Sequence, residues 1–232
     1  LGGDATAYAA MLQTCAELKV GCTLVAVHAQ PTAELMPLVL QVREHIPAYK
    51  QAIEATVAEA ASASGGFVTT APTISFRHET KAPYRIIEKA LTKGPNREYP
   101  ETALDCSKVL DVFGCIIECA DYACMTAVVG AFAARHNRGE LRLCRVKDRW
   151  TNPSSGGWRD LMLNLVINDV VFEVQIVLHQ MLVARTALDA HKAYNQFRSV
   201  AEVFDLLNMS TEMQVSGDGG DGGDGGGGRT VV

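Results

Sequence analysis

The stretch GGWRDLMLNLVINDVVFEVQI, residues 156–176, is the most informative part of this chain. It holds two runs rich in Leu, Val, Ile and Phe, separated by Asn168-Asp169. Asparagine and aspartate accept the positive φ angles of a two-residue hairpin turn, so we predict an antiparallel β-hairpin. The hairpin raises a question, because an otherwise apolar strand carries a glutamate and a glutamine two residues apart, at Glu173 and Gln175.

The predicted register places the polar residues of the hairpin on one face. With a two-residue loop, Asn164 lies opposite Glu173 and Met162 lies opposite Gln175, and opposed residues share a face. Because side chains alternate along a strand, Asp160 belongs to the same face. The opposite face is apolar and consists of Leu161, Leu163, Phe172, Val174 and Ile176. The polar face is either a solvent-exposed sheet surface or the lining of a functional site.

The rest of the chain predicts a mixture of helices and strands. Residues 4–29 begin as a helix, and residues 31–62 have a strongly helical pattern in which Pro37 and Pro47 are expected to break or kink the helix. Further elements are expected in this order: an extended segment at 67–79, a helix at 82–94 closed by Gly94, a short helix leading into a buried strand at about 109–119, an amphipathic helix at 121–137, a strand at 140–150 and a helical segment at 178–209.

The composition is that of a folded domain with appendages. The chain has 232 residues, 48% of them hydrophobic, and its net charge of −5 argues against broad nucleic-acid binding. Residues 135–149 nevertheless hold six Lys or Arg against two acids, which is either a solvated face or part of a site. The predicted units are a helical region (1–66), a central domain (67–209) and a Gly/Asp-rich flexible tail or linker (210–232).

The cysteines and the hydropathy pattern bear on the cellular compartment. The seven cysteines are irregularly spaced, which is typical of free thiols in a reducing compartment, so we expect a cytoplasmic protein. No run of about 18 apolar residues predicts a membrane span. The chain begins with leucine, and we therefore expect it to be a piece of a longer protein.

Residues 147–161, KDRWTNPSSGGWRDL, resemble a motif of the RelA/SpoT synthetase family. That motif reads Lys-Asp-Tyr-Ile, two residues, Pro-Lys, one residue, then Asn-Gly-Tyr-Gln-Ser-Leu-His, and its spacing matches without a gap. Residues 173–176, EVQI, match the start of the family's Glu-Val-Gln-Ile-Arg-Thr strand. Weaker resemblances follow the family's order at 81–89, 109–114 and 190–194.

The resemblance implies a nucleotidyltransferase-like fold of the α/β (α+β) class, with a mixed, largely antiparallel sheet flanked by helices. Members of that family transfer pyrophosphate from ATP to the 3′-hydroxyl of GDP or GTP and so make (p)ppGpp. Some small relatives instead modify the 3′ end of tRNA. The resemblance therefore implies an Mg²⁺-dependent pyrophosphokinase whose partners are ATP and a guanosine nucleotide, with tRNA as another possible acceptor.

The same resemblance assigns roles to particular residues. Asp111 would hold Mg²⁺, and Glu173 would act on the acceptor hydroxyl as a base or as a second metal contact. Phosphoryl-type transfer depends on positioning and on charge neutralisation, which two carboxylates with nearby cations would supply. Trp158 takes the place of a tyrosine that stacks on the acceptor base. The other predicted site residues are Lys81, Arg145 and Lys147, which would meet phosphates, and Gln175, which would support the site by hydrogen bonding.

The chain departs from the family pattern at several positions. Glu79 replaces an arginine, for which Arg77 is a candidate substitute, and Ser154 replaces a phosphate-contacting lysine. Asp160 and Met162 replace the serine and histidine of the acceptor site. A cation on a transferring phosphate contributes roughly a few kcal/mol. A catalytically inactive nucleotide-binding or interaction domain of a multidomain protein is therefore the alternative hypothesis.

Overall fold

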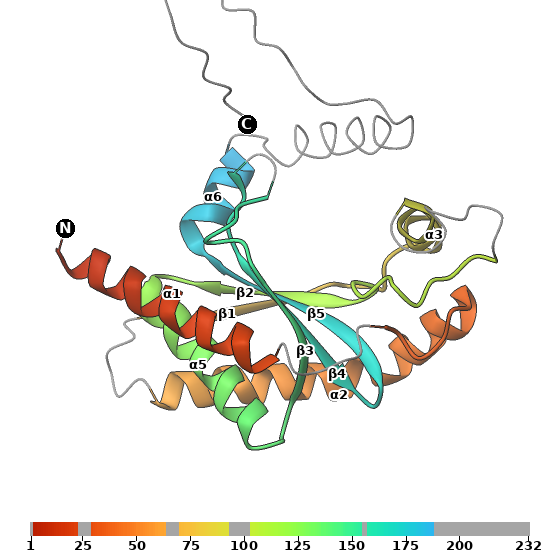
Figure 1. Ribbon diagram of the computed structural model, residues 1–232, viewed down its shortest axis with the longest axis horizontal. Helices are drawn as coiled ribbons and strands as arrows, with labels where there is room; N and C mark the ends of the chain where they lie inside the picture. The colour runs from red at the N-terminus through yellow and green to blue at the C-terminus, as the bar shows by residue number, and fades with distance from the viewer. Residues whose placement is uncertain (1, 23–28, 64–69, 93–102, 155–156, 188–232) are drawn as a thin grey trace, which may run out of the picture.

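A computed structural model describes residues 2–22, 29–63, 70–92, 103–154 and 157–187 of the chain (Figure 1). Its centre is a five-stranded sheet in the order β1-β2-β5-β4-β3. The strands are Thr73–Phe76 (β1), Gly114–Cys119 (β2), Arg142–Asp148 (β3), Leu161–Ile167 (β4) and Val170–Leu178 (β5). β2 and β5 are parallel and the other neighbouring pairs are antiparallel. The prediction of a mixed, largely antiparallel sheet is therefore confirmed.

Helices cover both sides of the sheet. α1, α2 and α5 lie on one side, and α3 and α6 lie on the other (Figure 1). Their bounds are Gly2–Cys22 (α1), Leu35–Ala63 (α2), Pro83–Thr92 (α3), Tyr122–Asn137 (α5) and His179–Ala187 (α6). Among the helices of the described ranges, none combines the length and the apolar composition needed to cross a membrane.

β4 and β5 form the predicted hairpin. Asn168 and Asp169 have φ angles of 48° and 66°, the left-handed values of a tight two-residue turn. Asn164 lies opposite Glu173, which is the predicted register. A slip of one residue would exchange the two faces of the hairpin, so the turn also decides which side chains reach the core.

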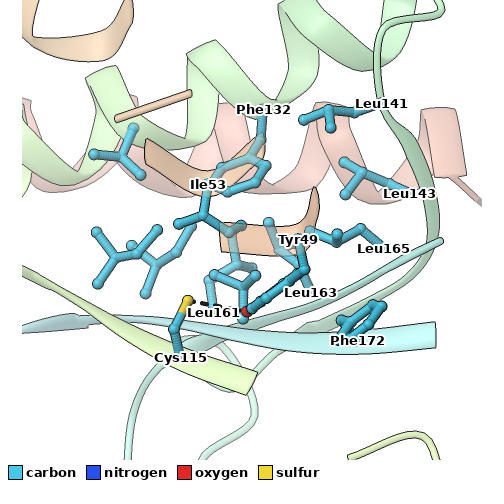
Figure 2. Packing of buried hydrophobic residues seen from close by; sticks show 14 of the residues in the cluster. Tyr49, Ile53, Cys115, Phe132, Leu141, Leu143, Leu161, Leu163, Leu165 and Phe172 are labelled. Atoms are coloured by element: carbon cyan, nitrogen blue, oxygen red, sulfur yellow. Dashed lines mark hydrogen bonds between the residues drawn. The ribbon is translucent and has the colours of Figure 1, made fainter. Parts of the chain in front are cut away.

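The apolar face of the hairpin packs against α2 and α5 (Figure 2). Tyr49 and Ile53 of α2, Phe132 of α5, and Leu163 and Phe172 of the hairpin are all fully buried in one hydrophobic cluster. The Tyr49 ring stacks on Phe172 with the ring centroids 4.6 Å apart. Burial of apolar surface stabilises by about 25 cal/mol per Å², so this cluster is what holds the helices on the sheet.

α2 continues through both of its prolines, so of the predicted break or kink the break is wrong. Pro37 lies in the first turn, where a backbone N–H has no helical partner in any case. Pro47 lies inside the helix, where the lost hydrogen bond and the ring clash cost about 3 kcal/mol. Tertiary packing offsets that cost, because Tyr49 and Ile53 lie within two turns of Pro47 and are fully buried against the hairpin.

The segment before β2 is a loop rather than the predicted helix and early strand. β2 begins only at Gly114, and residues 103–113 are turns and irregular structure. The buried Gln30 side chain donates to the carbonyl of Val109 at 3.2 Å and to that of Val171 at 3.0 Å. It also accepts from the N–H of Val171 at 3.0 Å. A distant side chain thus satisfies backbone groups that an earlier strand would have paired in a ladder.

α5 is not the predicted amphipathic helix. Of the residues from Tyr122 to His136, Ala123 alone is exposed. The helix packs against the sheet on one side and against α1 and α2 on the other. Its apolar residues therefore have neighbours on nearly every side, and a one-sided apolar stripe is not needed.

Several predictions fall on residues outside the described ranges. These are the closure of the third helix by Gly94, the helical segment beyond residue 187, the family resemblance at 190–194 and the tail at 210–232. The boundaries at residues 66 and 209 also fall there, so the division into domains stays a prediction. Within the described residues, α1 and α2 share one hydrophobic core with the sheet.

Candidate functional site

The polar face of the hairpin is buried. Asp160 and Asn164 are 0% exposed and Glu173 is 7% exposed. A solvent-exposed sheet surface is therefore the wrong interpretation of this face. Buried polar groups are costly unless they are hydrogen-bonded or paired, so the partners of these three side chains are informative about the site.

The strand register arranges the predicted site residues in two rows across the sheet. One row runs from β2 to β3 through Gly114, Glu173, Asn164 and Arg145. The neighbouring row on the same face holds, in the same strand order, Ile116, Gln175, Met162 and Lys147. Three strands therefore bring cationic, amide and carboxylate side chains onto one surface.

Asp111, in the loop before β2, gathers cations from α3 and the segment before it. Nζ of Lys81 lies 2.8 Å from Oδ2 of Asp111, and Nζ of Lys89 contacts the same oxygen. Burial raises the pKa of Asp111, but the charges of Lys89 and Lys81 outweigh it and hold that pKa below its ordinary value. We call Asp111, Glu173, Arg77, Lys81 and Lys89 the acid–lysine cluster.

Glu173 is the second acid of this cluster. Nη2 of Arg77 lies 3.7 Å from its Oε1, and Nε2 of Gln175 donates to the same oxygen at 3.0 Å. Burial, followed by the negative charge of Asp111, raises the pKa of Glu173 against the opposing charge of Arg77. The two acids therefore differ: Asp111 is held ionised, whereas Glu173 takes up a proton more readily.

The segment between β1 and α3 is bonded to the loop that carries Asp111. The N–H of Arg77 donates to the carbonyl of Gly114 at 3.1 Å, and the N–H of Lys81 donates to that of Val112 at 2.7 Å. Nη1 of Arg77 also donates to the backbone carbonyl of Asp111 at 2.9 Å. Burial lowers the pKa of Lys81 to about 8, against the opposing charge of Asp111.

The backbone of Glu173 is held by two hydrogen bonds and lies close to Gly114. Its N–H donates to the carbonyl of Phe113 at 3.1 Å, and the hydroxyl of Tyr49 donates to its carbonyl at 2.7 Å. An added Cβ at Gly114 would lie 2.5 Å from that carbonyl oxygen. The close approach of β2 to β5 at this point therefore requires glycine.

Arg145 and Lys147 have different environments on β3. Nε of Arg145 donates to Oδ1 of Asn164 at 2.8 Å, and Nδ2 of Asn164 donates to the carbonyl of Phe172 at 3.2 Å. Burial lowers the pKa of Arg145, while the negative charge of Glu173 opposes that shift. Lys147, one row further along, is exposed. The structure therefore brings Arg145 to the acid–lysine cluster and leaves Lys147 at the edge of the polar face.

Trp158 lies at another part of the same face. Its Nε1 donates to Oδ2 of Asp160 at 3.0 Å, and Nη1 of Arg149 lies 2.9 Å from each oxygen of that carboxylate. Burial raises the pKa of Asp160, which the charge of Arg149 opposes. The guanidinium of Arg185, from α6, lies 5.1 Å from the centroid of the indole ring. We call these four residues the Trp158 cluster.

The cations of the basic run at 135–149 lie in two different environments. Arg135 and Arg138 pair with Glu140, and Arg138 also pairs with Glu59 of α2, so they connect the end of α5 to its neighbours. The cations further along the run alternate on β3 and reach the polar face at Arg145, Lys147 and Arg149. The run is therefore neither a single solvated face nor a continuous nucleic-acid-binding patch.

The residues present suit the predicted Mg²⁺ only as an ion that substrate phosphates help to bind. Asp111 and Glu173 offer carboxylate oxygens, and Mg²⁺ usually binds one or two carboxylates together with substrate phosphates. Within the described ranges, no group of three or more His, Cys, Asp or Glu side chains forms a metal site. The donor set thus suits a cation that arrives with phosphates and does not suit a closed structural metal site.

Comparisons with known proteins found similarity to solved structures alone. No model of a known family matches the chain, and no curated protein sequence is significantly similar to it. Among solved structures, small alarmone synthetase 1 from Bacillus subtilis, bound to its product pppGpp, is 16% identical with a TM-score of 0.46, over 73% of this chain and 88% of the synthetase. Small alarmone synthetase 2 from the same organism is 23% identical with a TM-score of 0.45, over 68% and 82%.

A GTP pyrophosphokinase family protein from Streptococcus pneumoniae is 15% identical with a TM-score of 0.37, over 73% of this chain and 96% of that protein. At such identities and TM-scores the likeness carries no argument about activity. The functional argument therefore rests on the side chains of this chain.

Some residues of the two clusters were not predicted from the sequence. Lys89 had a usable signal, because it lies three residues after Ile86 and beside Ala90, both buried, and thus on the inner face of α3. Arg149 had no such sequence signal, because only the folded structure brings it to its partner Asp160. Arg77, the candidate substitute for the family's arginine, lies within the acid–lysine cluster.

Proposed function

We propose that this chain is a pyrophosphokinase that transfers the pyrophosphate of ATP to the 3′-hydroxyl of a guanosine nucleotide. The acid–lysine cluster is the observation that carries this proposal. The buried Glu173 and the half-buried Asp111, two acids of unequal basicity, lie beside three cations, next to a sheet face that also holds Arg145. Such a cluster has the charges that phosphoryl-type transfer needs, namely cations for phosphates and a carboxylate near the acceptor.

The cations outnumber the acids in this part of the face. Arg77, Lys81, Lys89 and Arg145 carry four positive charges against two acids. The negatively charged triphosphate of ATP would bind to these excess positive charges. Lys81 and Lys89 contact Asp111 through long flexible side chains, which can turn toward a phosphate once another cation neutralises that acid.

Glu173 is the residue suited to act as the base. Its raised pKa makes it a better proton acceptor than an ordinary carboxylate. In the proposed step the acceptor oxygen bonds to the β-phosphorus of ATP, the bond from that phosphorus to the α–β bridging oxygen breaks and AMP leaves. The proton of the acceptor hydroxyl passes to Glu173. Mg²⁺ held by Asp111, with Glu173 near by, would supply charge neutralisation on the phosphates.

A nucleotide-binding domain without turnover is the second candidate function. One observation favours it: Lys81 and Lys89 both contact Asp111, so the chain itself neutralises the acid that would hold Mg²⁺. This candidate retains the cations and predicts binding of ATP without transfer. A tRNA acceptor is less favoured, because the basic run does not form a continuous patch.

A turnover assay separates these functions. The folded protein is incubated with Mg²⁺ and γ-labelled ATP, and GDP, GTP, ADP and bulk tRNA are offered separately as acceptors. We expect label on GDP or GTP and release of AMP. Glu173→Gln should abolish the transfer, whereas Asp169→Asn, the same change at a side chain that is 86% exposed in the hairpin turn, should not. ATP binding without transfer to any acceptor would replace the proposal with the second candidate.

A further inference from the structure

The loop that carries Asp111 is held by hydrogen bonds to its backbone carbonyls. Every carbonyl from Val109 to Gly114 accepts such a bond. The donors are the side chains of Gln30, Asn164 and Arg77 and the backbone N–H groups of Arg77, Lys81 and Glu173. Asp111 itself lies in a turn, so these bonds rather than a strand determine where its carboxylate lies.

Gln30 differs from the other donors because it bonds the backbone that leads into both acids. Its Nε2 donates to the carbonyl of Val109 at 3.2 Å and to that of Val171 at 3.0 Å, and its Oε1 accepts from the N–H of Val171 at 3.0 Å. Val109 precedes Asp111 by two residues, and Val171 precedes Glu173 by two residues. One amide group therefore joins the two segments that carry the acids.

The pairing of β2 with β5 begins only after these segments. Its first pair is Gly114 with Glu173, and the N–H of Glu173 also donates to the carbonyl of Phe113 at 3.1 Å. Ahead of that point the loop turns at Asp111, so Gln30 supplies a connection that a longer strand would have given. Gln30 is 4% exposed, so solvent competes little for its bonds.

The chemistry of Gln30 matches the backbone groups that it meets. They are two carbonyl oxygens and one N–H, and a glutamine amide offers two N–H donors and one carbonyl acceptor. A glutamate in its place would repel both carbonyls. An apolar side chain would take a partner away from three buried backbone groups, which is costly. The position therefore requires an amide.

The backbone around Gln30 is bonded to the same loop. The N–H of Gln30 donates to the carbonyl of Ser107 at 2.7 Å, and the N–H of Cys106 donates to that of Ala33 at 2.9 Å. These bonds join the segment before α2 to the segment that leads to Asp111. The side chain of Gln30 thus extends from a fixed point, and the N-terminal helical region contributes directly to the support of the site.

We propose that Gln30 is a positioning residue that sets the distance between Asp111 and Glu173. Groups that act together on one ion or one reacting bond must be held within about 0.5 Å of their productive geometry. Gln30 meets this need because a single planar amide bonds the supports of both acids. This inference rests on the proposed function, since it concerns the two acids that the transfer would use.

A double-mutant cycle measured by denaturant unfolding tests the inference without requiring turnover. It combines Asp111→Asn with Gln30→Met, which keeps the length of the side chain and removes the amide. Thr56→Val is the matched control, because it keeps the volume and removes a buried hydroxyl that accepts from Arg135 at 2.9 Å. Thr56 belongs to α2, on the other side of the sheet from α3 (Figure 1). Gln30→Asn, whose amide is one methylene shorter, replaces Gln30→Met if the latter does not fold.

We expect the two cycles to differ. Asp111→Asn should cost at most about half as much stability in the Gln30→Met background as in the wild type, because a displaced Asp111 has already lost contact with Lys81 and Lys89. In the Thr56→Val background the cost should equal that in the wild type. A purely structural role of Gln30 would give the same cost in all three backgrounds, and that result would overturn the inference.

The Mg²⁺ concentration that gives half-maximal ATP binding is the second readout, and calorimetry measures it. Groups that hold a metal ligand in place typically contribute about 10- to 100-fold to metal affinity. Folded Gln30→Met should therefore need at least about tenfold more Mg²⁺ than the wild type, whereas Thr56→Val should need the same. An unchanged Mg²⁺ requirement in Gln30→Met would also overturn the inference.

The two proposals fail in different ways. A cost of Asp111→Asn that depends on Gln30, in a protein that transfers no pyrophosphate, would overturn the proposed function and leave the positioning role standing. Transfer to GDP or GTP, together with equal costs in all backgrounds, would overturn the inference and leave the proposed function standing. If the wild type does not bind ATP, the proposed function fails and the unfolding cycle alone decides the inference.

Discussion

The acid–lysine cluster and the Trp158 cluster lie on one face of the same sheet, yet they balance their charges differently. In the first, Asp111 contacts two lysines, and Arg77 lies between the two acids. In the second, Asp160 is matched by Arg149 at 2.9 Å. Both clusters hold more cations than acids. The cations of the first gather around Asp111 and Glu173, whereas those of the second support the Trp158 ring, Arg149 through Asp160 and Arg185 by lying against the ring.

This difference indicates how one sheet face can serve two parts of a substrate. Phosphates need a surplus of positive charge, and a surplus is tolerated near the surface of a site that a ligand will fill. A base needs a flat apolar surface at a defined place, for which matched buried charges are a suitable support. The predictions below test whether the two clusters are independent, in order of expected effect.

Asp111→Asn should have the largest effect. It removes the counter-charge of Lys81 and Lys89 and should reduce the free energy of unfolding by about 3 kcal/mol, as expected when one member of a buried ion pair is removed. Transfer should also be lost. Glu173→Gln should abolish transfer without lowering the free energy of unfolding, because burial already disfavours the charged form of Glu173. Denaturant unfolding at pH 7, compared with the turnover of both variants, checks this contrast.

The effect of Asp111→Asn should depend on pH with a definite sign. The folded-state pKa of Asp111 is below its ordinary value of 3.8, so its stabilisation is fully present above that value and is lost as the pH falls toward the folded-state pKa. The stability difference between wild type and variant should therefore shrink below about pH 4. A difference that is the same at pH 7 and pH 3 would contradict the pairing with the lysines.

Gly114→Ala should disturb the acid–lysine cluster and spare the Trp158 cluster. The new Cβ would lie 2.5 Å from the carbonyl oxygen of Glu173, and relieving that overlap should cost about 2 kcal/mol of folding free energy. Gly130→Ala in α5 is the matched control, because its Cβ meets nothing within 4 Å and should stabilise by about 0.5 kcal/mol or more. Unfolding and the emission of Trp158 are measured for both, and a changed emission in Gly114→Ala would show that the clusters are coupled.

ATP binding should weaken above pH 8 because of Lys81. Burial lowers the pKa of this lysine to about 8, so it loses its charge between pH 7 and 9 while the arginines keep theirs. We expect ATP affinity to fall about tenfold over that range, equivalent to about 1.4 kcal/mol. Lys81→Arg should abolish the fall, because arginine stays protonated. Calorimetric titrations at several pH values test this, and a parallel fall in the arginine variant would assign the effect to another group.

Tyr49→Phe should have the smallest effect. It removes the hydroxyl that donates to the carbonyl of Glu173 but keeps the ring stacked on Phe172, so the protein should lose about 1 kcal/mol of stability. Transfer should decrease less than in Gly114→Ala, and the response of Trp158 to GDP should be unchanged. Denaturant unfolding and the turnover assay measure the two effects. A loss of transfer as large as that of Glu173→Gln would contradict the view that Tyr49 only positions the backbone of Glu173.

How far the sequence predicts this protein depends on whether the deciding interactions are local. The turn at Asn168-Asp169 and the alternation along β4 and β5 are local, and they predicted both the hairpin and its register. A break at Pro47, one of the two predicted outcomes, was wrong, because tertiary packing around Tyr49 outweighs the local cost of the proline. The start of β2 was also predicted wrongly, since a buried side chain 79 residues away, Gln30, bonds the preceding loop at Val109.

The same distinction between local and long-range interactions applies to the candidate site. Motif spacing indicated Glu173 and Asp111, and alternation placed Asp160 on the face of Glu173. The contact of Lys89 with Asp111 could not be predicted, because the two residues lie 22 positions apart in the chain. The basic run at 135–149 shows the same limit, since identical residue types a few positions apart either pair with neighbouring helices or line the polar face.

By itself, the sequence determined the hairpin, the division of its side chains between two faces and the class of fold, because alternation and turn chemistry act over a few residues. Only the tertiary structure decided that the polar face is buried, that Asp111 and Glu173 share cations and that Asp160 pairs with Arg149. Those facts depend on which distant segments the hydrophobic core brings together. They also decide the pKa of each acid, since burial and neighbouring charge are properties of the folded chain.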